Sequence, residues 1–385
     1  MYRNVLVFFM FAGLSFPVVA QPPSAQARSL KEAYKDAFVV GVAINLTQIF
    51  EQDDRSASII TSQFNSITPE NILKWALVHP QPNRYDFAAG DRFVEFGVRN
   101  KMFIVGHCLV WHNQTPKWVF EDDKGNLLTR DALLKRMQDH ISTVVGRYKG
   151  RINGWDVVNE AIDEDGSLRQ TPWLKIIGDD YIEKAFQYAH ETDPKAELYY
   201  NDYSLENEAK RKGAIALIER LKRKGIPVHA VGLQGHDNLE WPTVAQQDAT
   251  IAAFERLGVK VHITELDITV LPSRNKQVTA DVTARFELEP GLNPYPNGLP
   301  ESVQQKLAQR YAELFGVFLK HRDSVDRVTF WGVTDGDSWK NGWPIRGRTD
   351  YPLLFDRNGS PKPAFDAVVG VASAETARNE AQTRR

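Results

Sequence analysis

The 385-residue sequence contains a single cysteine, Cys108, and only four methionines. One thiol excludes an internal disulfide and any zinc site built on several cysteines. The sequence also lacks an excess of either charge, since 47 Lys and Arg stand against 49 Asp and Glu, for a formal net charge of −2 at pH 7. Such a balance offers no electrostatic attraction to nucleic acid or an anionic membrane, so we expect neither as a partner.

Motifs that would hold a nucleotide or a metal are also missing from the sequence. No GxGxxG or Walker-type loop follows a β-rich run, which weakens the case for a nucleotide-binding fold. His107 and His112 would face opposite sides of a strand, and no HExxH motif accompanies them. The run Asp335–Asp337 lacks the remaining ligands of a calcium loop. We therefore expect neither a metal nor a cofactor.

Charge is scarce at the N-terminus, where Arg3 precedes the almost wholly apolar run Val5–Phe16. Small or modest residues ending in Ala20 follow this run, and the pattern predicts a secretory signal peptide over residues 1–20, cleaved before Gln21. An uncleaved membrane anchor is the alternative, but the run is too short to span a bilayer comfortably. We therefore expect an exported protein, secreted or periplasmic, with no membrane contact after cleavage.

What the sequence does contain is typical of a folded globular protein, with 42% hydrophobic and 25% charged residues. Short β-rich runs that end in polar residues alternate with amphipathic or polar helical stretches. The predicted strands are Val39–Ile44, Ser66–Pro69, Phe103–Trp111, Ile152–Val158, Ala196–Asn201, Ala230–Gly235, Val261–Leu266 and Arg327–Val333. The predicted helices between them include Arg130–Tyr148, Tyr181–Thr192, Asn207–Lys224, Thr243–Leu257 and Ser302–His321.

This alternation predicts an α/β fold, a single closed (β/α)8 TIM barrel rather than an open doubly wound sheet. Most predicted strands begin about thirty to fifty residues apart, as a strand–helix repeat requires. The last interval is longer and rich in Pro and Gly, so we expect an elongated loop, Leu271–Glu301, after the seventh strand. We assign residues 21–371 to the barrel domain, with a last helix over Pro363–Val371, and residues 372–385 to a flexible tail.

Two glutamates end predicted strands, Glu160 the fourth and Glu265 the seventh. In a barrel, polar side chains at the C-terminal ends of strands point into the mouth of the active site. A pair of carboxyl groups across one mouth fits the arrangement used in glycoside hydrolysis. Taken alone, each glutamate could simply face solvent at a strand end, so the interpretation depends on the neighbouring residues.

Polar residues with compatible chemistry surround these two positions. Glu265 and Asp267 share one strand face, and Gln234 and His236 share a face of the adjacent strand, because side chains alternate with a period of two. A histidine beside one carboxylate can hydrogen-bond a second carboxylate and tune its pKa. Asn159, directly before the first glutamate, is an uncharged donor suited to a sugar hydroxyl.

Two further groups of residues could contact a sugar. We predict a short helix after the second strand with Glu70, Asn71 and Lys74 on one face, although Glu70 and Lys74 could equally form an ordinary helix ion pair. Trp331 and Trp339 lie at or just beyond the last predicted strand, where indole rings could stack on sugar rings, the alternative being core packing.

Together these motifs make the sequence similar to the family 10 glycoside hydrolases of the endo-β-1,4-xylanase type. The resemblance covers about residues 29–370, and the motifs occur in the family's order. They are Thr68-Pro69-Glu70-Asn71 with Lys74-Trp75, Gly106-His107 through Trp111-His112-Asn113-Gln114, Trp155-Asp156-Val157-Val158-Asn159-Glu160, Gly232-Leu233-Gln234-Gly235-His236, Ile263-Thr264-Glu265-Leu266-Asp267 and Trp331-Gly332-Val333-Thr334-Asp335.

The resemblance implies roles for individual residues. Glu160 would be the general acid/base and Glu265 the nucleophile of a retaining double displacement. Asn159 would bond the 2-hydroxyl of the sugar under attack, and His236 would orient Glu265, with Asp267 behind it. The residues that would line the glycone subsites are Glu70, Asn71, Lys74, His107, Trp111, His112, Gln114, Gln234, Trp331 and Trp339.

The sequence therefore predicts a secreted, retaining, monomeric endo-β-1,4-xylanase whose partners are xylan and xylo-oligosaccharides. A β-1,4-glucanase of the same fold is one alternative, since glucose differs from xylose only by a hydroxymethyl group. A non-catalytic polysaccharide-binding protein is another, although we would expect such a protein to lack one of the two glutamates.

Overall fold

The structure is a computed structural model that describes residues 29–273 and 281–383. The predicted signal peptide, residues 1–20, lies outside the described residues and stays a prediction. Among the helices that the structure describes, none is both long and apolar enough to cross a membrane.

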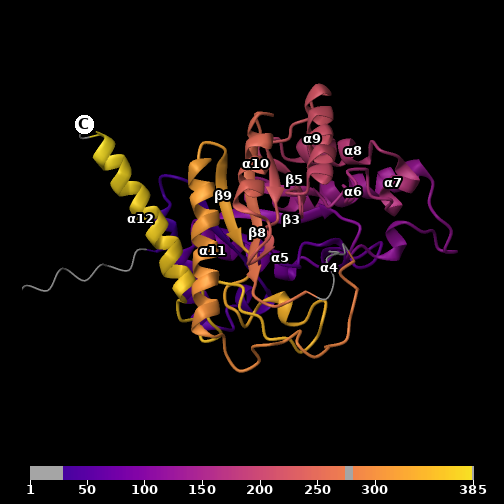
Figure 1. Ribbon diagram of the computed structural model, residues 1–385. Coiled ribbons are helices and arrows are strands. Elements are labelled where there is room, and N and C mark those ends of the chain that lie inside the picture. Colours follow the sequence, from indigo (N-terminus) through magenta and orange to yellow (C-terminus); the bar gives the residue numbers. More distant parts are fainter. Residues whose placement is uncertain (1–28, 274–280, 384–385) are drawn as a thin grey trace, which may run out of the picture.

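Parallel strands form a closed barrel in the centre of the molecule (Figure 1). The sheet closes because β1 pairs with β9 on one side and β6 pairs with β8 on the other. β7 follows β6 almost directly and pairs with the far end of β8. The strands are β1 Val39–Ile44, β2 Ser66–Pro69, β3 Phe103–Val110, β4 Gly154–Asn159, β5 Glu197–Asp202, β6 Ala230–Leu233, β7 His236–Asn238, β8 Lys260–Thr269 and β9 Val325–Phe330. The predicted (β/α)8 barrel is thus confirmed.

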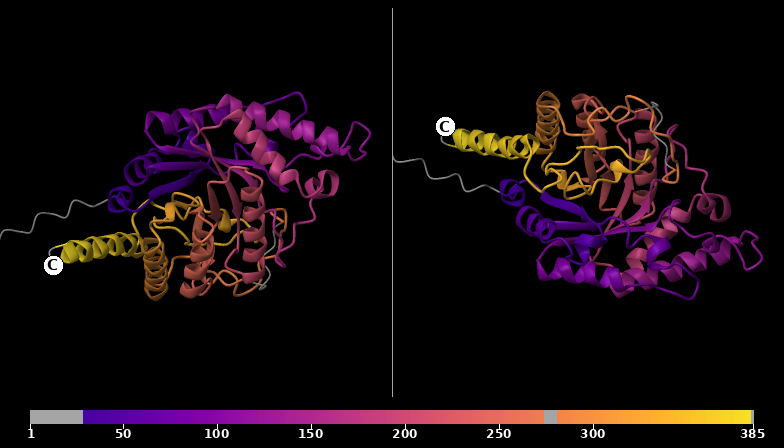
Figure 2. Two further views of the ribbon diagram at one scale, coloured as in Figure 1. Left: turned by 90° about the horizontal axis from the view of Figure 1, so that it is seen from above. Right: turned by 90° about the horizontal axis from the view of Figure 1, so that it is seen from below.

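Helices surround the strands on the outside, as the views from above and below show (Figure 2). In α8, the apolar residues Ile182, Ala185, Phe186 and Ala189 recur at helical spacing and are all buried. The helices are α1 Leu30–Ala33, α2 Leu46–Ile49, α3 Asp54–Gln63, α4 Trp75–Val78, α5 Ala88–Arg99, α6 Arg130–Arg147, α7 Pro172–Ile177, α8 Tyr181–Thr192, α9 Glu208–Arg223, α10 Val244–Glu255, α11 Glu301–Lys320 and α12 Pro363–Thr383, with 3₁₀ turns at Lys117–Val119 and Trp339–Asn341.

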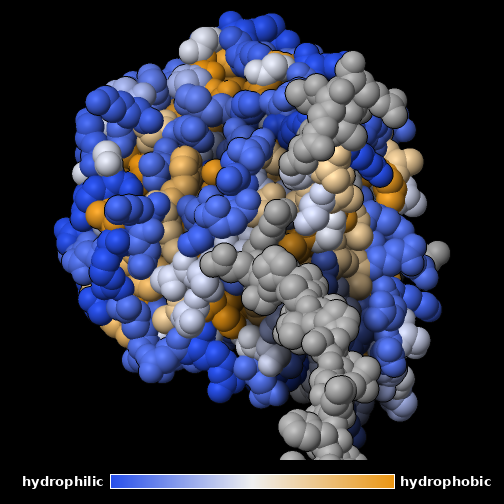
Figure 3. Space-filling view, turned by 90° about the vertical axis from the view of Figure 1, so that its left-hand side faces the viewer, coloured by the Kyte–Doolittle hydropathy of each residue, from blue (hydrophilic) through white to orange (hydrophobic). Residues whose placement is uncertain are grey.

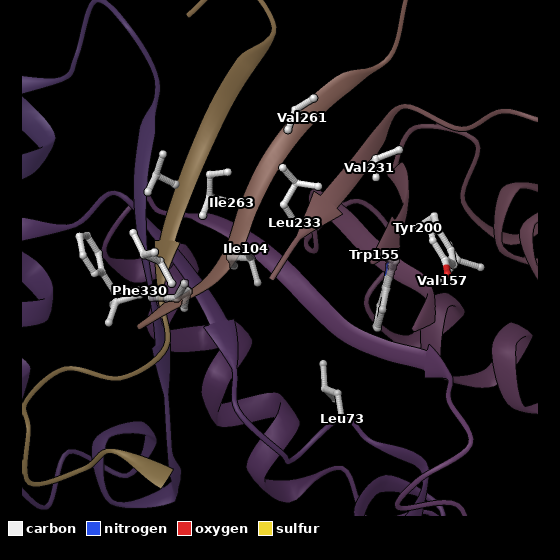
Figure 4. Close-up of a cluster of buried hydrophobic side chains, with 14 of the residues drawn as sticks. Leu73, Ile104, Trp155, Val157, Tyr200, Val231, Leu233, Val261, Ile263 and Phe330 are labelled. Carbon is white, nitrogen blue, oxygen red and sulfur yellow. The ribbon is translucent and has the colours of Figure 1, made fainter. Parts of the chain in front are cut away.

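The main hydrophobic core lies between the strands and the helices (Figure 4). Strand residues such as Trp155, Val231 and Ile263 are almost fully buried in it. A second, smaller cluster joins Val105 and Tyr199 with a residue of β6, so three strands contribute to it. Apolar packing on both sides of the strands leaves their C-terminal ends as the place where polar side chains can gather.

The connection after β8 is the elongated loop that the sequence predicts. Between Leu271 and Pro300 no helix or strand occurs among the described residues, and α11 begins at Glu301. The Phe286 backbone N–H donates to the Pro344 carbonyl at 2.9 Å, which ties this loop to the loop after β9. The loop therefore forms part of the barrel mouth.

The C-terminal helix differs from the prediction. We expected it to end at Val371, whereas α12 continues to Thr383. Ala372 is buried, and Glu375 forms an ion pair with Arg322 at 3.0 Å. The extension is alanine-rich and contains no Gly or Pro beyond Gly370, so nothing in it opposes helix formation. The face of the molecule that includes α12 is mostly hydrophilic, with small apolar patches (Figure 3).

Candidate active site

The C-terminal ends of the strands open into a cleft of about 690 Å³. The predicted site residues that line it are Glu70, Asn71, Lys74, His107, Trp111, Gln114, Asn159, Glu160, Gln234, His236, Glu265, Trp331 and Trp339. Asp267 lies behind the cleft and is fully buried. His112 lines a separate hollow with Arg169 and Thr171 instead of the cleft.

Glu160 follows β4 and turns its side chain into the cleft. Its backbone has φ 58°, a left-handed conformation that is uncommon for a residue with a side chain and is typical of functional sites. Its carboxyl group accepts hydrogen bonds from Trp111 Nε1 at 2.9 Å, Gln234 Nε2 at 3.1 Å and Asn159 Nδ2 at 3.3 Å. All three donors are neutral groups.

Glu265 lies near the end of β8 in a different electrostatic environment. Its carboxyl group accepts a hydrogen bond from Asn201 Nδ2 at 2.8 Å and lies 3.1 Å from His236 Nε2. Burial alone would raise the pKa of Glu265. The hydrogen bond from His236 and the positive charges of His107, His236 and Lys74 outweigh burial and hold that pKa below its usual value. Glu265 is therefore held as a carboxylate at neutral pH.

His236 sits between two acids because β7 and β8 are paired with His236 opposite Asp267. The distance from His236 Nδ1 to Asp267 Oδ1 is 3.0 Å, and Asp267 also accepts a hydrogen bond from Trp339 Nε1 at 2.7 Å. Burial opposes a charged His236, but the charges of Asp267 and Glu265 raise its pKa to about 9. At neutral pH both ring nitrogens consequently carry protons and can donate to the two carboxylates.

A pair of asparagines connects the two glutamates, and sequence reasoning missed one of them. Asn201, the second-last residue of β5, donates from one amide group to Asn159 Oδ1 at 2.9 Å and to Glu265. Its oxygen accepts a hydrogen bond from Thr264 Oγ1 at 2.6 Å. Asn159 in turn donates to Glu160. The signal was available, since Asn201 ends an apolar run just as both glutamates do.

The segment after β2 is a turn, so the predicted short helix at Glu70–Lys74 is wrong, and α4 begins only at Trp75. Lys74 Nζ donates to Asn71 Oδ1 at 3.1 Å and lies 4.9 Å from the centre of the Trp111 ring. Glu70 forms no ion pair with Lys74 among the described residues, and burial raises the Glu70 pKa against the nearby Lys74 charge. The polar groups of this turn therefore face the cleft instead of pairing along a helix.

Aromatic rings from the segment after β9 also line the cleft. Trp331 packs edge-on against His107, with ring centres 5.4 Å apart, and Trp339 packs against His236 at 4.9 Å. Trp343, which sequence reasoning missed, stacks on Trp339 at 4.7 Å and also lines the cleft. In the part of the chain that the structure describes, no group of three or more His, Cys, Asp or Glu side chains is placed to hold a metal ion.

Comparison with known proteins identifies the family to which this geometry belongs. The model of glycosyl hydrolase family 10 matches residues 29–371. The chain belongs to glycosyl hydrolase family 10. This membership confirms the resemblance seen in the sequence motifs. It also makes the protein a glycoside hydrolase, so that the paired glutamates are the natural candidates for its catalytic groups.

Individual members of family 10 are similar over most of the chain. An endo-1,4-beta-xylanase A of Xylanibacter ruminicola is 45% identical over 341 residues, which are 89% of this chain and 92% of the relative. A beta-1,4-xylanase of Dictyoglomus thermophilum is 44% identical over 343 residues, which are 89% and 90% of the two chains. A GH10 endoxylanase retrieved from a sugarcane soil metagenome has a solved structure with a TM-score of 0.87 and 48% identity, covering 89% of this chain and all of that one.

The charge of Asp267 predicts a specific change in pH dependence. Because Asp267 raises the pKa of His236 toward 9, Asp267→Asn should lower that pKa. A neutral His236 no longer stabilises the Glu265 carboxylate with a positive charge, so on the alkaline side activity should begin to fall at a lower pH in the variant. We expect the alkaline limb of kcat/KM on a soluble xylo-oligosaccharide to move down by roughly one to two pH units.

A second variant, whose alkaline limb is expected to shift in the opposite direction, is the control for this experiment. Lys340 Nζ lies 3.2 Å from Asp267 Oδ1 and offsets its charge. Lys340→Met should therefore raise the His236 pKa and move the alkaline limb to higher pH. An alkaline limb that stays in place in both variants would show that His236 does not control activity in this range.

Proposed function

We propose that this protein is an endo-β-1,4-xylanase that hydrolyses internal bonds of xylan with retention of anomeric configuration. The observation that carries the proposal is the unequal environment of Glu160 and Glu265 in one cleft. Glu265 is stabilised as an anion by His236 and other cationic groups, whereas Glu160 has neutral hydrogen-bond donors. Two carboxyl groups in such different environments can serve as nucleophile and acid.

In the first step, the Glu265 carboxylate attacks the anomeric carbon while Glu160 gives its proton to the leaving glycosidic oxygen. The sugar is then held as an ester of Glu265, whose negative charge is gone. In the second step, Glu160, now a carboxylate, removes a proton from water, and the resulting hydroxide displaces Glu265. The Glu160 carboxyl is restored, and two inversions at one carbon give net retention.

The relatives favour xylan as the substrate. The relatives named above are xylanases, and the family match over residues 29–371 spans the residues of the cleft. The residues that would have to accommodate the hydroxymethyl group of a glucan lie around Lys74, Trp331 and Trp339, which all line the cleft. Aromatic rings at this position can stack on the flat faces of sugar rings in a neutral polymer.

Proton NMR of xylohexaose digestion tests activity and stereochemistry in one experiment. We expect cleavage at internal bonds, with newly formed reducing ends that appear first as the β-anomer. Initial release of the α-anomer would contradict retention. Rates on xylan and on a soluble cellulose should be compared in parallel, and equal rates would contradict the xylanase assignment. Binding of both polymers without any hydrolysis would indicate a carbohydrate-binding protein.

We also propose that the protein is exported by its N-terminal segment. The support is the apolar run Val5–Phe16 followed by Ala20. Expression of the full chain in a Gram-negative host, followed by fractionation, should place the activity outside the cytoplasm, with an N-terminal sequence that begins at Gln21. Activity confined to the cytoplasm with an intact N-terminus would contradict export.

A further inference from the structure

One wall of the cleft is formed by the loop after β8 and the loop after β9, which lie together beyond the ends of the strands (Figure 1). Arg285 from the first loop and Trp343 and Arg348 from the second line this wall. None of these residues belongs to the hydrogen-bonded network around the two glutamates. Their chemistry differs from what a neutral sugar chain requires, because two of them are permanently positive.

Arg348 has no anionic partner in the described part of the chain. Its Nε is buried and has no hydrogen-bond partner there. Burial lowers the pKa of the Arg348 guanidinium, although the charge of Asp350 acts in the opposite direction. Asp350 is occupied elsewhere, since its carboxylate accepts hydrogen bonds from Thr269 Oγ1 and from the backbone N–H groups of Val270 and Tyr351.

Residues 1–28, 274–280 and 384–385, whose structure is not described, contain no Asp or Glu in the sequence. A partly buried guanidinium without a directly bonded counter-ion is costly, and an anionic ligand in the cleft would lower that cost.

Two neighbouring donors strengthen this interpretation. The indole Nε1 of Trp343 is also buried without a hydrogen-bond partner among the described residues. Arg285 uses one nitrogen to donate to the Val282 and Ala284 carbonyls, at 2.8 and 2.7 Å, and forms no ion pair in the described part of the chain. Lys340, in the same cleft, differs because it pairs with Asp267.

We propose that Arg348, together with Arg285 and Trp343, binds the carboxylate of a uronic acid substituent on the xylan chain. The proposal rests on the proposed function, because the substituent reaches this wall only when its polymer occupies the cleft. A guanidinium presents parallel N–H groups that match a carboxylate, and the indole N–H can supply a further hydrogen bond. An uncharged side group would leave the arginine without its counter-ion.

A pair of substrates that differ only in charge tests this directly. Glucuronoxylan is compared with the same polymer after chemical reduction of its carboxylates to primary alcohols. We expect wild-type kcat/KM to be about tenfold higher on the charged polymer, the usual range for a hydrogen bond to a charged group. Arg348→Met should abolish this preference, and Arg348→Lys should restore part of it. In the wild type, the preference should decrease as salt is added.

Arg346→Met is the matched control, since Arg346 lies in the same loop and carries the same charge but is exposed and does not line the cleft. It should keep the full preference. Equal wild-type rates on the two polymers, or equal effects of the Arg346 and Arg348 substitutions, would overturn the proposal. Cleavage of unsubstituted xylohexaose distinguishes failure of the uronate site from failure of the proposed function. If the wild type cleaves it without any preference for the charged polymer, the uronate site alone is wrong. If it does not cleave it, the proposed function fails as well.

Discussion

Replacing Glu265 with alanine is expected to lower kcat on xylan by about 10⁵-fold, equivalent to about 7 kcal/mol of transition-state stabilisation. The reason is that the covalent intermediate cannot form without this carboxylate. Asp267, the other carboxylate bonded to His236, lies behind the cleft and is fully buried, so it cannot reach the sugar in place of Glu265. The rate is measured as release of reducing ends, with the unfolding temperature as a check on folding.

Azide provides a control for this variant. Alanine leaves a space where a small anion can attack the anomeric carbon directly, while Glu160 can still protonate the leaving group. The product should therefore be a glycosyl azide of inverted configuration. If the Glu265→Ala variant kept more than about one per cent of its activity without azide, Glu265 would not be the nucleophile.

Glu160→Ala is expected to separate substrates by the quality of their leaving group. On xylan, which needs protonation of the leaving oxygen, the rate should fall by about 10²–10⁴-fold, the usual contribution of general acid–base catalysis. An aryl xylobioside with a dinitrophenolate leaving group needs no acid, so its first step should proceed at close to the wild-type rate. The measurement is the burst of released phenolate.

The second step of this variant should then be slow, because no base activates water. Azide should restore turnover and give a glycosyl azide of retained configuration, the opposite of the Glu265→Ala outcome. Equal losses on xylan and on the activated substrate would contradict the assignment of Glu160 as acid/base.

The regular parts of the fold could be predicted from the sequence. The strands Val39–Ile44 and Ser66–Pro69 and the helix Tyr181–Thr192 have the bounds that the patterns predict. Strands of a closed parallel barrel are covered on both sides, so they read as short apolar runs between amphipathic helices. Both glutamates were found in the same way, because a carboxylate that ends an apolar run is conspicuous.

The features that escaped prediction depend on tertiary contacts. Glu70 lies in a turn whose side chains line the cleft and in which Lys74 donates to Asn71, and helix propensity cannot reveal that. The link between the glutamates depends on Asn201, from a strand that carries neither of them. Trp343 becomes part of the cleft only because its ring stacks on Trp339. In each case the deciding partner is distant in sequence or is fixed by the fold.

The central claim is that Glu265 becomes covalently bonded to the sugar, while Glu160 first donates a proton to the leaving group and then removes one from water. The measurement that tests it most directly is mass spectrometry of the protein after reaction with an activated 2-deoxy-2-fluoro xylobioside, in which the fluorine slows breakdown of the intermediate. We predict a single added glycosyl group on the peptide that contains Glu265, and loss of activity in step with labelling. A label on Glu160 or on any other carboxylate, or continued turnover of the reagent by unlabelled protein, would contradict this account.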